Sequence, residues 1–305
     1  MENLSFSGAP VAFKQKIRPL HWVVKIGSLK KSLELLTSLG CRVLRHEEFT
    51  AGCEATCNGP YSGHWSKSMV GFDTEDVSFV FELTFNYGVD FYKRGNDLKE
   101  IRMFKYNHEG KDMEPLVSGF EGVKKEGEVY NVLNGDFLIT FVDKKAPGVQ
   151  LIEGLTLNVR DLEENYRFWT KLGLRRDGDA LKFDGYDYFN LYLDQANVID
   201  RGEAFGRIAI SCHDDDVEKV FKESGAKVVN EPITLKTEGK ADVVVTILQT
   251  PDDQEICFVN DAGFRDLSKE TSEQIDWERH DKQNAARKKY NDRCARIEEN
   301  KKNQE

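Results

Sequence analysis

Two polar side chains lie on segments that alternate like β-strands, and together they could bind a metal ion. His21 shares one face of residues 20–26 with Val and Lys, and Glu82 lies on the polar face of residues 80–86, opposite Phe and Leu side chains. An imidazole and a carboxylate on facing strands can reach one divalent cation at about 2.0–2.2 Å each. The alternative is a polar strand face that is open to water.

The strand that carries His21 opens a pattern that occurs twice in the chain. Residues 21–40 and 154–173 each read as a strand, a capping residue (Ser28 or Asp161), a helix with one apolar stripe and a final glycine. Glycine is the preferred residue for the left-handed position that ends a helix. We therefore predict a duplicated unit with its site where copies meet. The second copy has a glycine in place of His21.

Three further strand candidates follow each copy, and similar stretches lie at 99–144 and 206–259, the latter with an expected helix at 215–224. We count four units in two pairs, each unit a strand, a helix and three strands, which makes an α+β fold. An Ala-Pro-Gly loop at 146–148 indicates the boundary between halves. The expected domains are 18–146 and 150–264, followed by a charged tail at 265–305 that is helical or disordered.

Composition limits the function classes. The 305 residues suggest two domains, and the net charge of −10 disfavours binding to DNA or RNA. No apolar run approaches the roughly 18–20 residues of a membrane span, and the first residues lack a secretory signal. We expect a cytoplasmic protein, with a mitochondrial location as the alternative. A protein partner for the charged tail stays an open alternative.

The six cysteines include no Cys-x-x-Cys pair and form no pattern of a secreted protein. We therefore expect them to be reduced thiols. Cys53 and Cys57, four residues apart, give only a weak indication of a metal site.

Several segments resemble the vicinal oxygen chelate superfamily. Residues 21–40 and 82–96 resemble glyoxalase I, and residues 43–49 and 57–72 resemble glyoxalase-domain-containing proteins. The resemblance implies βαβββ half-barrels, paired so that a concave sheet surrounds a site. It also implies a lactoylglutathione lyase reaction, in which the hemithioacetal of methylglyoxal and glutathione is isomerised. A divalent metal, Zn or Ni, would bind the substrate while a carboxylate moves the proton, with glutathione as co-substrate.

The resemblance gives roles to individual residues. It implies that His21 and Glu82 bind the metal and that Glu82 or Glu100 is the base. If the first unit pairs with the fourth, the other two ligand positions hold Arg207 and Cys257. If it pairs with the second, they hold Glu100 and no fourth ligand. Neither pairing supplies the four ligands of the family.

Further residues are implied to bind the substrate, which is a small-molecule thiol adduct. Lys25 and Asn86 match positions that hold the glutamyl end of glutathione. Arg207 would oppose a divalent cation, but it could neutralise an enediolate or a carboxylate directly. The third unit has Gly154 and Asn190 at the corresponding positions, so we expect its site to be inactive.

Two functions follow from this pattern. The first is a metal-assisted isomerase of the lactoylglutathione lyase type with one working site. The alternative is a non-catalytic member of the superfamily that binds a small molecule or a protein and has a degenerate metal site.

Overall fold

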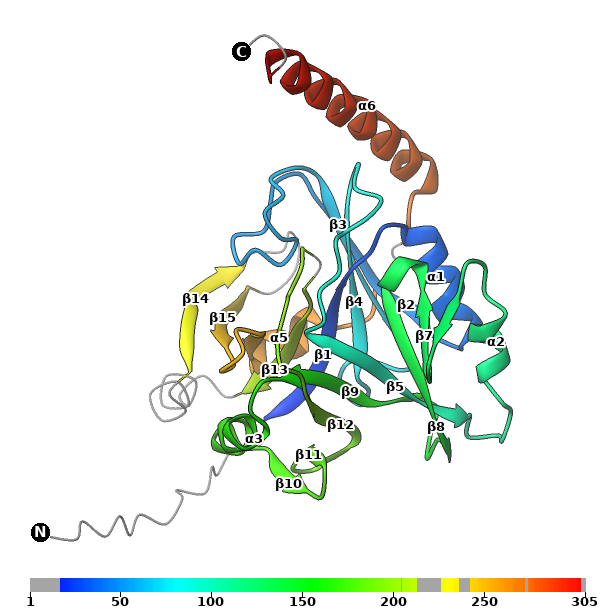
Figure 1. The fold of residues 1–305 in the computed structure, drawn as a ribbon, viewed down its shortest axis with the longest axis vertical. Helices are drawn as coiled ribbons and strands as arrows, with labels where there is room; N and C mark the ends of the chain where they lie inside the picture. Colours follow the sequence, from blue (N-terminus) through cyan, green and yellow to red (C-terminus); the bar gives the residue numbers. More distant parts are fainter. Residues whose placement is uncertain (1–16, 204, 213–225, 236–241, 272–273, 303–305) are drawn as a thin grey trace, which may run out of the picture.

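The computed structural model describes residues 17–203, 205–212, 226–235, 242–271 and 274–302. The helix expected at 215–224 lies outside these residues. The described strands form two sheets of eight strands each, with few helices (Figure 1). This confirms the predicted α+β class.

The first sheet has the strand order β14-β15-β16-β13-β1-β4-β3-β2. Its strands are β1 (Arg18–Lys25), β2 (Arg42–Phe49), β3 (Trp65–Gly71), β4 (Val80–Asn86), β13 (Arg207–Cys212), β14 (Lys227–Leu235), β15 (Val243–Gln249) and β16 (Glu255–Asn260). The second sheet has the order β10-β11-β12-β9-β5-β8-β7-β6. Its strands are β5 (Leu98–Tyr106), β6 (Lys124–Glu126), β7 (Val129–Val132), β8 (Phe137–Lys145), β9 (Ile152–Val159), β10 (Arg175–Asp177), β11 (Ala180–Phe183) and β12 (Tyr186–Gln195).

The strand orders decide which units pair. The first unit joins the fourth because β1 runs antiparallel to β13, and the second joins the third because β5 runs antiparallel to β9. Each sheet therefore takes one unit from residues 18–146 and one from 150–264. This corrects the expectation that each half of the chain forms a domain by itself. The pattern of one strand does not reveal which distant strand completes its edge.

The helices that repeat in the sequence form as predicted. In α1 (Leu29–Ser38), the side chain of Ser28 accepts a hydrogen bond from the Lys31 amide, and in α3 (Leu162–Lys171), Asp161 caps in the same way. The glycine after each helix has a positive φ, 102° at Gly40 and 106° at Gly173. Glycine adopts this conformation without the steric penalty of a Cβ atom. Short α2 (Glu114–Ser118) and the 3₁₀ helix η1 (Leu133–Gly135) connect strands of the second unit.

One large apolar core joins the two sheets. Phe79, before β4, stacks on Phe189 of β12 with ring centroids 3.8 Å apart, and Phe81 meets Phe137 of β8 edge-on at 6.0 Å. Aromatic side chains bury much apolar area and stabilise such contacts. The apolar face of β4 therefore packs against the second sheet. The polar face, with Glu82, points to the opposite side.

The region expected to be a tail begins with a helix of the folded body. Helix α5 (Asp261–Leu267) buries Phe264 and Leu267 in an apolar cluster on the first sheet. Beyond it, α6 (Trp277–Lys302) extends away from the sheets, so the helical alternative applies to these residues (Figure 1). The start of α6 is anchored, because His280 Nδ1 lies 3.2 Å from the Tyr87 hydroxyl. Among the described residues, no helix is long and apolar enough to cross a membrane.

Candidate functional site

The structure brings His21 and Glu82 together on the concave face of the first sheet. They lie on the neighbouring parallel strands β1 and β4, and His21 Nε2 is 3.2 Å from Glu82 Oε2. The other ring nitrogen, Nδ1, is 3.1 Å from Oε1 of Glu75, in the turn before β4. The exposed fractions are 5% for His21, 6% for Glu82 and 1% for Glu75. Sequence reasoning missed Glu75, because a turn residue has no strand or helix period to reveal where it points.

The two carboxylates favour the charged form of the imidazole. Burial lowers the pKa of His21, but the hydrogen bonds and charges of Glu75 and Glu82 raise it above its ordinary value overall. Burial by itself raises the pKa of Glu82, yet its hydrogen bond and ion pair with His21 bring that pKa down to about 2. The site therefore places an imidazole, whose charged form is favoured, between two carboxylates.

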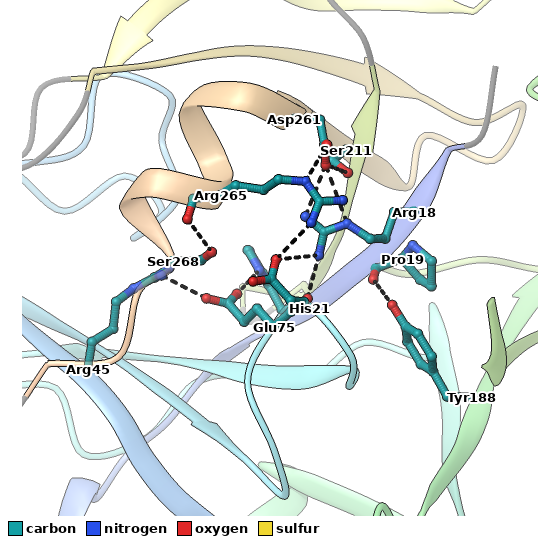
Figure 2. A network of polar contacts seen from close by, with 11 residues as sticks. Arg18, Pro19, His21, Arg45, Glu75, Tyr188, Ser211, Asp261, Arg265 and Ser268 are labelled. Carbon is teal, nitrogen blue, oxygen red and sulfur yellow. Dashed lines mark hydrogen bonds and ion pairs between the residues drawn. The ribbon is translucent and has the colours of Figure 1, made fainter. Parts of the chain in front are cut away.

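Glu75 also connects the site to helix α5 (Figure 2). Its Oε2 atom lies 2.7 Å from the Arg45 guanidinium, and that guanidinium donates to the Leu267 carbonyl at 3.2 Å. Arg18 donates to the backbone carbonyl of Glu75 and pairs with Asp261 at 3.0 Å. These buried contacts fix α5 over the end of the concave face where His21 lies.

The remaining ligand positions do not carry metal donors. Arg207, on β13, donates from Nε to Glu255 Oε2 at 2.9 Å and from NH1 to the Ala55 carbonyl at 2.9 Å. Cys257, on β16, is a protonated thiol at neutral pH, because burial raises its pKa to about 12. In the described part of the chain, no group of three or more His, Cys, Asp or Glu side chains could hold a metal ion. Since a catalytic divalent ion generally has three protein ligands, these residues do not fit one.

Glu100 does not join this site, which corrects its expected role as a base beside Glu82. It lies on β5 in the second sheet. There it accepts hydrogen bonds from Thr140 at 2.7 Å and Thr156 at 2.9 Å, and it pairs with Arg102 at 3.2 Å. The pairing of the first unit with the fourth places β13, rather than β5, beside His21.

The concave face of the second sheet holds its own closed polar network. Arg102 Nε donates to Glu153 Oε2 at 2.9 Å, and the amide of Asn190 lies 3.2 Å from Glu153 Oε1. The Tyr192 hydroxyl also donates to Glu153. Gly154 stands where the first sheet has His21, so this face lacks an imidazole at that position.

Lys25 and Asn86 share the concave face with His21 and Glu82, but internal partners already occupy them. The Lys25 ammonium donates to the Phe205 carbonyl at 2.9 Å, and burial, aided by the charge of Arg207, lowers the pKa of Lys25 to about 7. Both polar atoms of the Asn86 amide bind Asn58, at 3.0 Å each. Asn86 therefore holds the loop between β2 and β3 in place.

That loop contains a disulfide between Cys53 and Cys57. The expectation that all six cysteines are reduced thiols is therefore wrong for this pair. Two cysteines four residues apart can either close a small disulfide-bonded ring or remain free thiols. The sequence contains no signal that favours the disulfide over the thiols.

A small cavity of about 70 Å³ remains between the loop, the sheet and α5. Its lining combines polar and apolar residues. The polar or sulfur-containing ones include His21, Lys67, Glu82, Arg207 and Cys57, and the apolar ones include Val243, Val245, Val259, Phe264 and Leu267. A larger cavity of about 270 Å³, beside Arg94, Asp97 and Asp136, lies apart from His21 and Glu82.

Comparisons with known proteins agree with this architecture. Residues 161–267 match the family model of the glyoxalase domain-containing protein 4-like C-terminal domain. The chain is 39% identical to "Glyoxalase 1" of Caenorhabditis elegans over 83% of this chain and 91% of that protein. It is 38% identical to "Glyoxalase domain-containing protein 4" of Rattus norvegicus over 83% and 88%. The crystal structure of glyoxalase I from Zea mays shares the fold, with a TM-score of 0.62, 21% identity and coverage of 82% of this chain and 95% of that chain.

Proposed function

The chain belongs to the glyoxalase domain-containing protein 4 family, and from this premise we propose that it binds a small carboxylate-bearing thiol adduct without metal-assisted turnover. The observation that carries the proposal is that the ionisable side chains at the expected ligand positions pair with other side chains of the protein. The imidazole lies between Glu75 and Glu82, and Arg207 is bound to Glu255 at the position where a third ligand would be needed.

The protonation states support binding over isomerisation. A general base works best when its pKa is near the operating pH, and a carboxylate with a pKa of about 2 accepts a proton poorly at neutral pH. Glu100 cannot take over the role, because it lies in the other sheet.

The chemistry of the concave face supports the choice of ligand. The cations Lys67 and Arg207 line the cavity together with apolar side chains, and each cation also pairs with a carboxylate of the protein. Cations of this kind bind carboxylates, and the apolar side chains accommodate a short acyl or alkyl group. A cavity of about 70 Å³ has room for such a group, while the rest of a larger adduct requires movement of the loop that carries the disulfide.

The test combines binding and metal analysis. We expect isothermal titration calorimetry with S-lactoylglutathione to give the same affinity with and without a chelator, and elemental analysis of the purified protein to find no stoichiometric metal. We also expect no thioester formation from methylglyoxal and glutathione above the uncatalysed rate with Ni, Zn, Co or Mn added. Stoichiometric metal that is lost in His21→Ala, together with thioester formation, would contradict the proposal.

A metal-assisted isomerase of the lactoylglutathione lyase type is the second candidate. The relative named "Glyoxalase 1" favours it, as does the geometry of His21. Glu75 on Nδ1 is the kind of outer partner that orients a metal-binding histidine, and Nε2 faces Glu82 at 3.2 Å. Under this proposal, His21 and Glu82 would hold Zn or Ni and glutathione would be the co-substrate. The thioester assay above separates the two candidates.

A further inference from the structure

The loop with the disulfide closes the site by occupying two side chains that were expected to bind substrate. Arg207 donates to the carbonyl of Ala55, inside the disulfide ring, at 2.9 Å. Asn86 binds Asn58, the residue after the ring, and Asn58 also accepts from the Cys53 amide at 3.0 Å. The state of the disulfide therefore affects both side chains at once.

The two sulfurs have different surroundings. Cys57 lines the cavity together with Lys67 and Arg207, whereas Cys53 packs against the apolar cluster of the first sheet. Both cysteines are partly exposed. Thiol–disulfide exchange requires a thiolate to reach one sulfur. Cys57 is the sulfur that faces the cavity, where Lys67 and Arg207 can attract an incoming anionic thiol.

The backbone inside the ring supports an opening motion. Thr56 has a φ of 54°, which is unfavourable for a β-branched residue. The ring between Cys53 and Cys57, with the Thr56 carbonyl accepting from Gly59 at 2.9 Å, holds the backbone in this conformation. When the ring opens, Thr56 can return to an extended conformation and take the Ala55 carbonyl away from Arg207.

We propose that Cys57 is a site of thiol–disulfide exchange with a small carboxylate-bearing thiol, and that exchange opens the loop and releases Arg207 from Ala55 and Asn86 from Asn58. The thiolate of the small molecule attacks Cys57 Sγ, a new S–S bond forms, and the bond to Cys53 breaks. Cys53 leaves as a thiolate and takes a proton from water. One disulfide replaces another, so no oxidant or reductant is consumed. The proposal stands on the loop geometry and does not depend on the function proposed above.

The test uses the full chain, purified without reductant, and glutathione as the probe. After incubation at neutral pH, new thiols are alkylated with iodoacetamide, and both cysteines are located by peptide mass mapping. We expect glutathione on Cys57 and the alkyl group on Cys53. Lys67→Gln should slow the adduct several-fold, while the matched change Lys227→Gln, at an exposed lysine of β14, should not.

Two single variants check the assignment without requiring the disulfide. In Cys53→Ser, the remaining Cys57 should form a mixed disulfide with oxidised glutathione, and in the matched Cys57→Ser, Cys53 should react several-fold more slowly. Hydrogen exchange of the loop amides should increase in the adduct. The proposal is overturned if the cysteines of the purified protein are both free thiols, if glutathione is found mainly on Cys53, or if the adduct forms only in denaturant. If glutathione still forms the adduct on Cys57 but the protein does not bind S-lactoylglutathione, only the proposed function is contradicted.

Discussion

The two concave faces of this molecule share one scaffold and differ in how they use it. In the first sheet, His21 lies between two carboxylates beside a cavity that a disulfide loop covers. In the second sheet, the corresponding position is Gly154, and an added Cβ atom there would lie 2.3 Å from the Asn190 carbonyl oxygen and 3.1 Å from the Tyr192 ring. The second face therefore has no space for a side chain at this position.

The difference shows that duplication preserved the strands and helices but not the chemistry. Both faces bury acidic groups, and both neutralise them with an arginine or a histidine. Among the described residues, the first face alone places a buried histidine beside a cavity at this position. The second binds its carboxylates internally, through Thr140, Thr156 and Arg102. We infer that the first face binds the ligand and that the second has a structural role.

The largest expected effect comes from Glu75→Ala, which breaks the buried network of the first face. The change removes the carboxylate that His21 Nδ1 and Arg45 NH1 share, although His21 keeps Glu82 and Arg45 keeps Glu47. Loss of one member of a buried ion pair costs about 3–5 kcal/mol. Chemical denaturation measures this loss. The matched variant Glu153→Ala in the second face should cost less, about 1–3 kcal/mol, because Arg102 is partly exposed. Equal losses would show that the two networks are equivalent.

The next largest effect is on how the stability of the protein depends on pH. The pKa of Glu82 is about 2 in the folded protein, below its ordinary value of 4.5. Its contribution to the free energy of unfolding is therefore complete above pH 4.5 and is lost as the pH falls toward 2. The contribution is on the order of 3 kcal/mol. The raised pKa of His21 acts in the opposite sense, because its contribution is present below pH 6.5 and is lost as the pH rises through the folded value. Urea unfolding of the wild type and Glu82→Gln between pH 2 and 8 measures both. If the free energies of unfolding of the two proteins differed by the same amount at every pH in this range, the assigned pKa shift of Glu82 would be wrong.

A smaller effect is expected for Gly154→Ala in the second face. The new methyl group would meet backbone and ring atoms, and forced packing of this kind costs about 1–3 kcal/mol. Thermal unfolding measures the loss, and S-lactoylglutathione affinity in the first face should not change. If the variant were as stable as the wild type, the second face would have more room than the structure shows.

The smallest effect on ligand binding is expected for Glu100→Gln. Glu100 lies in the second sheet, so calorimetric affinity for S-lactoylglutathione should stay within about twofold, less than 0.5 kcal/mol. The amide oxygen of Gln can accept from one of Thr140 and Thr156, and its NH2 group can donate to the hydroxyl oxygen of the other. A tenfold loss of affinity would place the ligand in the second face and reverse the comparison.

Local patterns in the sequence predicted the repeated units and their helix ends correctly. The capping side chains Ser28 and Asp161 and the glycines at 40 and 173 act over three or four residues, so nearby sequence is enough to identify them. Strand alternation also placed His21 and Glu82 on one polar face, because side chains of a strand alternate with a period of two.

Only the tertiary structure decided what those two side chains meet. Glu75 comes from a turn and Arg207 from a unit more than half the chain away, and contacts between such distant segments leave no periodic signal in sequence. The pairing of β1 with β13 removed Glu100 from the site, and the disulfide loop bound Asn86. The residue types and the face of a strand on which a side chain lies are local properties of the sequence. The residues that the side chain contacts depend on which strand edges pair, and the whole fold determines that pairing.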